Sequence, residues 1–461
     1  AGAGGVGKVM AEWIIAGQPE WDIWRLDVRR FGPNYAARDY VLARTLEAYS
    51  RHYDVHYPGY EHQSARMLRL SPAYYREQAL GAFFGEKSGW ERPNWYTPHE
   101  SLAEHGYEPQ GWARRSWSPA IGYEHRAVRE RAGLFDETSF SKIEIRGPGA
   151  VAFLQRLCAN DIARPVGSVV YTPLLNRRGG IECDVTITRL ADDRFLMVSG
   201  TALNVHDLSW LRLHQPEDGS VIIADVTSSR ACLGMWGPRA RTILERVTKA
   251  DVSNGAFPYM TARELTIGYV PVLALRVTYV GELGWEFYCP MEYGQRLWDT
   301  LWEAGQSEGL TPAGYKAIDS LRLEKGYRSW GADIGPDYTP YEAGLGFAVR
   351  LDKGEFIGRE ALLRQRETGW QRQLCCLTLA EPTQVVIGKE PIRPRGQETV
   401  IGWVTSGGYG YTVGKSIAYG YLPPEYAQVG MPLEVEILGE RIAAVVEAEP
   451  LWDPRGERIR S

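Results

Sequence analysis

The sequence predicts an α+β protein whose C-terminal part is a small β-barrel, and three observations carry this prediction. Strand-like alternation and helix-like spacing are mixed along the chain without the regular βαβ rhythm of a doubly wound sheet. Beyond about residue 372 the helical signals vanish, and short strands bounded by Gly and Pro remain. The 461 residues are enough for about three domains, and 44% of them are hydrophobic, which allows a sizeable core.

The composition argues against two classes of partner. Lys plus Arg is 52 and Asp plus Glu is 57, a net charge of −5, whereas a nucleic-acid binder needs a concentrated excess of cations. The apolar runs are far shorter than the roughly 20 residues of a membrane span. Six cysteines without CxxC spacing favour a reducing compartment over a disulfide framework. We therefore expect neither nucleic acid nor a membrane as a partner.

The first residues form a glycine-rich run that enters a helix ending near Gly17. Gly2 to Lys8 fits the first half of a phosphate-binding loop, but Val9 stands where Ser or Thr is needed to bind magnesium. A nucleotide site of that kind is therefore not expected. A chain that begins with Ala inside a glycine loop is typical of a fragment of a larger protein, and we expect this chain to be one.

The next part of the chain is expected to be a helix at residues 34–50, followed by an aromatic-rich segment at 72–98 that packs on its neighbours. Five histidines fall in this half, but none has Cys or carboxylates at zinc-site spacing. We expect surface or hydrogen-bonded histidines and no metal site. The five are His52, His56, His62, His99 and His105.

Alternating strands and helices are expected from about residue 118. Polar residues Glu182, Asp184, Thr186 and Thr188 alternate with apolar ones, which indicates a half-buried strand. Alternation at 273–279 turns through Gly281 and Gly284 into Trp285 and Phe287, which indicates a hairpin. The other expected elements are a strand at 143–146, helices at 151–158, 293–304 and 313–325, and barrel strands at 374–379, 400–404, 433–438 and 443–448.

Three polar positions are candidates for chemistry, and each has an ordinary structural alternative. Asp161 follows a helix C-terminus, where the helix dipole disfavours a carboxylate. It is either a functional residue or part of an ordinary Asn-Asp turn. Glu286 is opposite in alternation to Trp285 and Phe287, so it either faces solvent or is buried to hold two N–H donors of a heterocycle. Arg322 either clamps a carboxylate or pairs with Asp319.

Taken in order, several segments resemble the folate-dependent aminomethyltransferase family, typified by the T-protein of the glycine cleavage system. The resemblance covers about residues 118–455. Each piece is weak by itself, but the ordered set is specific. The segments are Glu124 to Arg129, Gly133-Leu134-Phe135-Asp136, Leu157 to Ile162, Leu174-Leu175-Asn176, Tyr279 to Glu286, Asp319 to Glu324 and Thr405-Ser406-Gly407.

Upstream segments resemble the junction in dimethylglycine and sarcosine dehydrogenases or oxidases, where a flavin domain is fused to a folate domain. They are Asp27 to Gly32, Phe84 to Lys87 and Gly89 to Trp95. The resemblance implies four parts. Residues 1–32 would be a remnant of the FAD-dependent domain, 33–117 a connecting segment, 118–371 the folate-binding domain and 372–461 the C-terminal β-barrel.

The resemblance also implies site residues and an activity. Asp161 matches the catalytic aspartate, Glu286 the pterin-binding glutamate, Tyr279 a tyrosine of the same cavity and Arg322 the arginine of the helix motif. Tyr171 and Leu174 fall where the family lines its folate cavity. The implied reaction captures the one-carbon unit from oxidative N-demethylation of an amine on tetrahydrofolate.

The implied partners are a small-molecule amine, folate and the missing flavin domain with its FAD. The implied location is the bacterial cytoplasm or the mitochondrial matrix. A non-catalytic folate-binding module and a folate-dependent methyl demethylase are the alternative functions.

Overall fold

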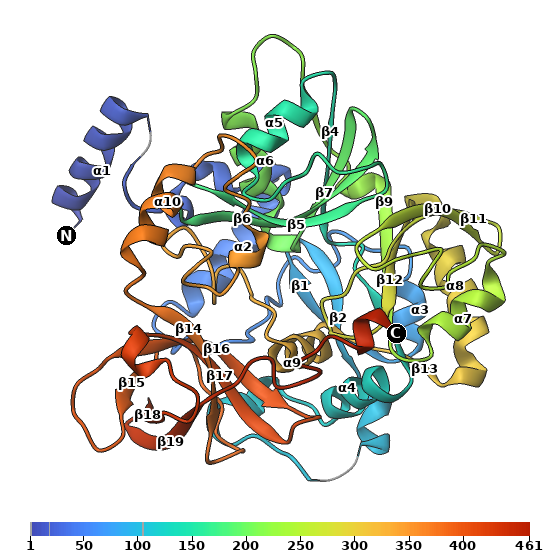
Figure 1. The fold of residues 1–461 in the computed structure, drawn as a ribbon. Helices are drawn as coiled ribbons and strands as arrows, with labels where there is room; N and C mark the ends of the chain where they lie inside the picture. The colour runs from blue at the N-terminus through green and yellow to red at the C-terminus, as the bar shows by residue number, and fades with distance from the viewer. Residues whose placement is uncertain (1, 18, 104–105) are drawn as a thin grey trace.

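The computed structural model describes residues 2–17, 19–103 and 106–461. Two larger sheets, a two-stranded hairpin and a closed barrel form its framework (Figure 1). A mixture of helices with these sheets confirms the predicted α+β class. None of the helices in the described ranges combines the length and apolar character that crossing a bilayer requires.

A six-stranded sheet, antiparallel except for its last pair, is covered on one face by α7 (Ala240–Val247) and α8 (Gly294–Gly305). Alternate strand residues such as Met235, Trp285 and Phe287 pack against these helices in one core cluster. In spatial order the strands are β10 (Ala262–Ile267), β11 (Val270–Leu275), β12 (Gly284–Pro290), β9 (Arg230–Trp236), β3 (Ala132–Asp136) and β13 (Leu310–Pro312).

A five-stranded antiparallel sheet has α5 (Ala150–Leu157) and α6 (Asn204–Leu213) on its outer face. Apolar strand residues, among them Cys183, Val185 and Ile187, pack beneath these helices as the alternation predicts. In spatial order the strands are β5 (Val169–Leu175), β6 (Ile181–Ala191), β7 (Arg194–Ser199), β4 (Ser141–Arg146) and β8 (Ile222–Asp225).

The C-terminal part is the closed barrel that the sequence predicts, followed by a tail that runs back over the body (Figure 1). Two of its six strands were not predicted, because β15 has only four residues, two of them Pro, and β17 contains a Gly. In order around the barrel the strands are β14 (Gln373–Leu379), β17 (Lys415–Leu422), β16 (Gly402–Gly410), β15 (Pro391–Pro394), β18 (Pro432–Ile437) and β19 (Glu440–Glu447).

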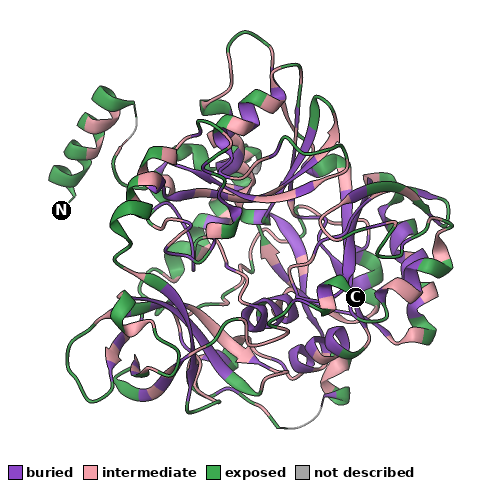
Figure 2. Ribbon diagram, in the orientation of Figure 1, coloured by how far each residue is buried: buried purple, intermediate pink, exposed green. Residues whose placement is uncertain are grey.

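The N-terminal part adds helices and a hairpin to this framework. Helix α1 (Ala3–Ala16) carries no buried residue and projects from the body (Figure 2). The aromatic-rich segment forms α3 (Tyr74–Ala79) and the paired strands β1 (Ala82–Lys87) and β2 (Trp90–Tyr96). The predicted helix at 34–50 is a 3-10 turn at Pro33–Ala36 followed by α2 (Arg38–Ser50). Of the five histidines, His105 lies outside the described residues.

Helices α4 (Ala120–Glu130) and α9 (Tyr315–Lys325) join this N-terminal part to the six-stranded sheet. The buried Glu124 carboxylate accepts the backbone N–H groups of Tyr96, at 2.7 Å, and of Gly314, at 2.8 Å. Gly314 is the residue before α9, so Glu124 satisfies a donor that a helix start leaves without a partner. This contact fixes the start of the helix that carries Arg322.

The predicted hairpin is corrected in one respect. Strand β11 ends at Leu275, so Val277 and Tyr279 lie in the loop that precedes β12 rather than in a strand. The Thr278 hydroxyl accepts the N–H groups of Val280 and Gly281, at 3.2 and 3.0 Å, which draws these groups away from a strand ladder. Gly281 has a φ of +79°, which favours glycine.

Candidate functional site

The inner faces of the two sheets pack against each other, and several of the candidate residues lie on them. Val169, Leu196 and Val198 of the five-stranded sheet pack in one cluster with Leu275 and Tyr288 of the six-stranded sheet. Because strand side chains alternate between faces, residues in register with this cluster point into the same space. We call it the inter-sheet space.

The inner face of β5 and β6 brings polar side chains into the inter-sheet space. Tyr171 pairs with Thr186, and Val169 with Thr188, so these four residues share that face. Asp184 lies on it as well, and its charge acts on the Tyr171 phenol of the neighbouring strand. Burial raises the pKa of Asp184 to about 6. Asp184 Oδ1 and Thr188 Oγ1 are buried without a hydrogen-bond partner in the part of the chain that the structure describes.

Glu286 faces the inter-sheet space from the other sheet. Trp285 and Phe287 point to the opposite face, into the core beneath α7 and α8, as the alternation predicts. The Glu286 side chain is buried, with 8% of the residue exposed, and the Tyr288 hydroxyl donates a hydrogen bond to Oε2. Burial raises the pKa of Glu286 to about 7, although Tyr288 and Lys142 oppose the shift. The solvent-facing alternative for Glu286 is therefore wrong.

Tyr279 approaches the same region from the loop before β12. Its hydroxyl donates to the Arg328 carbonyl at 2.7 Å, and its ring stacks on Tyr327 with 5.8 Å between centroids. Burial raises the pKa of Tyr279; the Arg322 cation opposes the shift, and the charges of Asp184 and Asp333 add to it.

Arg322 is part of a buried ion pair with a residue that the sequence did not single out. Its Nη1 donates to Asp333 Oδ2 at 2.8 Å and to the Tyr327 carbonyl at 3.2 Å. Asp333 also accepts the hydroxyl of Thr405 in the barrel at 2.6 Å. Burial acts to raise the pKa of Asp333, but Arg322 and the hydrogen bonds hold it below its usual range. The ion pair that Arg322 forms is with Asp333 and not with the predicted Asp319.

Asp161 lies along the edge of β5, directly after α5. Gln155 Nε2 donates to its Oδ1 at 2.6 Å, and the Ala163 N–H donates to the same oxygen at 3.0 Å. Partial burial acts to raise the pKa of Asp161, but these bonds and the nearby Arg164 and Lys353 hold it below its usual value. These donors offset the unfavourable end of the helix dipole, and the carboxylate stays ionised with 28% of its side chain exposed.

Leu174 differs from the other predicted residues in its direction. It is fully buried and packs with Cys158 and Cys183 in the core under α5, on the face opposite to Tyr171. We therefore do not include Leu174 in the inter-sheet site. Asp161 lies at the edge of β5, beside Gln155 of α5, and Glu286 lies on β12, so the two carboxyl groups belong to different sheets.

A mixed cluster of metal-ligand types lies beside the site. Ligand atoms of Cys183, His206 and Asp207 fall within 4.8 Å of one another. His206 Nδ1 is 3.0 Å from Asp207 Oδ1, and the Ser199 hydroxyl donates to Oδ2 of the same residue. Burial acts to lower the pKa of His206, but Asp207 and Glu182 raise it to about 9. His206 and Asp207 thus form a hydrogen-bonded ion pair.

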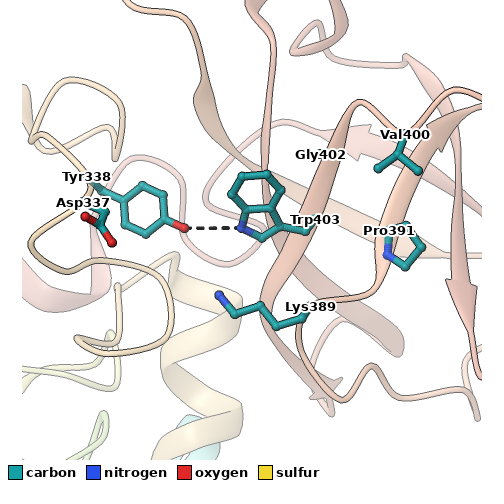
Figure 3. Close-up of a pocket in the computed structure, with 7 residues that line it drawn as sticks. All are labelled: Asp337, Tyr338, Lys389, Pro391, Val400, Gly402 and Trp403. Atoms are coloured by element: carbon teal, nitrogen blue, oxygen red, sulfur yellow. Dashed lines mark hydrogen bonds between the residues drawn. The ribbon is translucent and has the colours of Figure 1, made fainter. Parts of the chain in front are cut away.

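A groove of about 550 Å³ lies on the surface beside the barrel (Figure 3). Trp403 Nε1 donates to the Tyr338 hydroxyl at 3.3 Å across it, and the Lys389 ammonium extends below them. None of the six predicted site residues lines this groove. It adjoins the start of β6, because the Ile181 N–H donates to the Tyr338 carbonyl at 3.0 Å.

Sequence reasoning missed Asp184 and Asp333 as parts of the site. Asp184 belongs to the alternating polar set of β6, which was assigned to the exposed face of a half-buried strand. A second sheet covers that face, so its polar character was the available signal. Asp333 lies in a loop eleven residues after Arg322, and no spacing rule connects the two.

Comparison with known proteins agrees with this architecture. The family model of the GCVT N-terminal domain matches residues 73–353, and that of the glycine cleavage T-protein C-terminal barrel domain matches 372–453. The model of the FAD dependent oxidoreductase central domain matches residues 16–71. The crystal structure of the glycine cleavage system aminomethyltransferase T from Bartonella henselae superposes with a TM-score of 0.72 at 29% identity. That match covers 84% of this chain and 99% of the other.

Curated relatives extend the comparison over nearly the whole chain. The 4-methylaminobutanoate oxidase (formaldehyde-forming) of Paenarthrobacter nicotinovorans is 38% identical over 99% of this chain and 55% of its own length. The mitochondrial dimethylglycine dehydrogenase of Rattus norvegicus is 35% identical over 97% of this chain and 52% of its own length. The chain therefore spans about half the length of these relatives.

The facing sheets and the barrel define a protein of the aminomethyltransferase fold class. The chain belongs to the glycine cleavage T-protein (GCVT) family. The resemblance that the sequence motifs indicate is confirmed.

Proposed function

We propose that this chain binds tetrahydrofolate and transfers to it the one-carbon unit from oxidative N-demethylation of an amine of the dimethylglycine or sarcosine type. The product is 5,10-methylenetetrahydrofolate. The observation that carries the proposal is the polar lining of the inter-sheet space. Asp184 Oδ1 and Thr188 Oγ1 are buried there without partners among the described residues, which is costly unless a polar ligand satisfies them.

Glu286 and the two tyrosines fit the heterocycle of such a ligand. A carboxylate accepts two adjacent N–H donors, which matches the edge of a pterin ring. Tyr171 and Tyr279 supply flat apolar faces beside Asp184. Glu286 would orient the ring, and the tyrosines would exclude water around it.

Asp161 fits the part of tetrahydrofolate that reacts with the one-carbon unit. The product joins two nitrogens through one carbon, so the protein contributes orientation first. The Asp161 carboxylate, ionised and partly exposed, would stabilise positive charge near the nitrogens and accept a proton from one of them.

The flavin chemistry belongs to the part of such a protein that lies outside this chain. FAD would there oxidise the N-methyl amine, and residues 16–71 match the central domain of FAD dependent oxidoreductases. Relatives of this chain occur in a bacterium and in mitochondria, so we propose the bacterial cytoplasm or the mitochondrial matrix as the location.

The test is the rate at which the purified chain forms methylenetetrahydrofolate from tetrahydrofolate and formaldehyde, compared with the uncatalysed rate. We expect a rate well above background that is lost in Asp161→Asn. Binding of tetrahydrofolate without acceleration would identify a non-catalytic folate-binding module instead. Absence of binding would refute the proposal.

A further inference from the structure

A second buried carboxylate, Glu137, lies on the same face of the six-stranded sheet as Glu286. None of the family motifs includes it. Glu137 follows β3 directly, and its N–H donates to the Cys232 carbonyl at 2.9 Å, which extends the pairing of β3 with β9. Only 1% of Glu137 is exposed. Its Oε2 is buried and has no hydrogen-bond partner within the described ranges. An acceptor of this kind is costly to leave without a donor.

Gly234 shows where this oxygen points. A Cβ atom added to Gly234 would lie 2.8 Å from Glu137 Oε2. Gly234 is also the register partner of Glu286 on β12 and of Phe135 on β3, so Glu286 lies on the same face of the sheet. The missing side chain at position 234 leaves room for the Trp236 ring and, beside it, for Glu137 Oε2, on the face of the sheet that carries Glu286.

Among the described residues, the Lys142 ammonium acts on Glu137 and Glu286 at a distance but forms no ion pair with either. Lys142 Nζ donates to the carbonyls of Thr138 and Phe140, at 2.8 and 2.9 Å. Burial raises the pKa of Glu137 strongly, and the charge of Glu286 raises it further. The other titratable groups whose charges act on this pair, or are acted on by it, are Asp136, Lys142, Cys232, Tyr288 and Tyr315.

We propose that Glu137 is a second ligand-binding carboxyl group, which with Glu286 binds the 2-amino-pyrimidine edge of the folate heterocycle. This inference rests on the proposed function. One carboxylate can accept the ring N–H and one hydrogen of the 2-amino group, and the other 2-amino hydrogen then needs an acceptor of its own. Glu137 Oε2 supplies it. Glu137 is thereby a specificity-determining residue for a 2-amino heterocycle.

The test compares two ligands on four proteins by calorimetric titration. The ligands are tetrahydrofolate and its 2-desamino-2-methyl analogue, and the proteins are the wild type, Glu137→Leu, Glu286→Gln and Glu77→Gln. We expect Glu137→Leu, which removes the acceptor, to weaken tetrahydrofolate binding by about tenfold or more and to leave the analogue nearly unchanged. Glu77 is a matched control, because it is equally buried but accepts a hydrogen bond from Tyr96 at 3.1 Å. Glu77→Gln should not change either dissociation constant.

Thermal unfolding of the ligand-free proteins separates binding from structure. Glu137 Oε2 has no partner to lose among the described residues, so Glu137→Leu should unfold at the same temperature as the wild type or higher. A lower melting temperature with an unchanged ratio of the two affinities would overturn the inference. If Glu286→Gln loses tetrahydrofolate but Glu137→Leu binds it like the wild type, the inference fails and the proposed function stands. If the wild type binds neither ligand, both fail.

Discussion

Asn160 Nδ2 donates a hydrogen bond of 2.9 Å to the backbone carbonyl of Tyr171, and this bond ties the Asn-Asp segment to the edge of β5. The Asn160 N–H also bonds the Thr172 hydroxyl at 3.1 Å, and Asn160 Oδ1 accepts the N–H of Asp161. The turn that the sequence offered as the ordinary alternative therefore exists. It holds Asp161 next to a strand that lines the inter-sheet space.

Asp161→Asn should abolish most turnover while it keeps folate affinity within a few-fold. The amide oxygen can still accept from Gln155 and Ala163, so the turn survives, but the negative charge is lost. A well-placed acid–base group is worth about 10²–10⁴ in rate. Steady-state formation of methylenetetrahydrofolate and calorimetry measure the two effects. Equal losses of binding and turnover would contradict the role, and the exposed Asp218→Asn is the control.

Glu286→Ala should weaken binding of tetrahydrofolate first, by about tenfold or more, because a charge-assisted pair of hydrogen bonds is lost. Tyr288→Phe is the matched variant, since it removes only the hydroxyl that donates to Glu286 and keeps the carboxylate. It should cost much less affinity. Calorimetric titration measures both dissociation constants, and an unchanged value for Glu286→Ala would refute the assignment.

Arg322→Ala should destabilise the protein by about 3–5 kcal/mol, because it leaves the buried Asp333 carboxylate without its cation. Asp333 also accepts a hydrogen bond from Thr405 of the barrel, so the substitution should weaken the contact between α9 and the barrel. Denaturant unfolding measures the change. In the double variant with Asp333→Asn the two costs should not add; full additivity would show that the pair is not coupled.

As the pH rises, the contribution of Glu286 to folding stability should fall, whereas its contribution to folate binding should grow. Its pKa is raised to about 7, above the unfolded value, so its favourable contribution to folding is complete in acid and is lost as the pH rises through about 7. Folate binding needs the ionised form, so affinity should rise over the same interval. Unfolding and titration from pH 5.5 to 8.5 test this, and Glu286→Gln should flatten both curves. Parallel curves would contradict it.

Local periodicity predicted much of the fold. The spacing of apolar residues predicted α5, α8 and α9. The alternation around Trp285 predicted that Glu286 points to the opposite face of its strand, but it left open whether that face is buried or meets solvent. The same rule erred where a hydroxyl intervened, because Thr278 bonds the following N–H groups and ends the strand pattern before Tyr279. Strand β15 was missed because Pro391 and Pro394 hide its alternation.

The site was less predictable, because its decisive contacts join distant segments. The outward assignment of Asp184 and Thr188 assumed that a polar strand face meets water, and only the packing of a second sheet shows otherwise. The position of Glu137 Oε2 beside β9 depends on the absent side chain of Gly234, which lies about a hundred residues after Glu137 and about fifty before its register partner Glu286. Pairs of this kind leave no signature in the spacing of either segment.

The tail after the barrel reaches back to the loop that carries Tyr279. Arg458 Nε donates to Glu282 Oε2 at 2.7 Å, and Trp452 Nε1 donates to Oε1 of the same residue at 3.0 Å. Glu282 in turn accepts from Arg129 at 2.9 Å. Clipping by a carboxypeptidase, or a bulky purification tag fused at this end, would therefore disturb the loop that carries Tyr279. Activity assays are better designed with the tag at the other end.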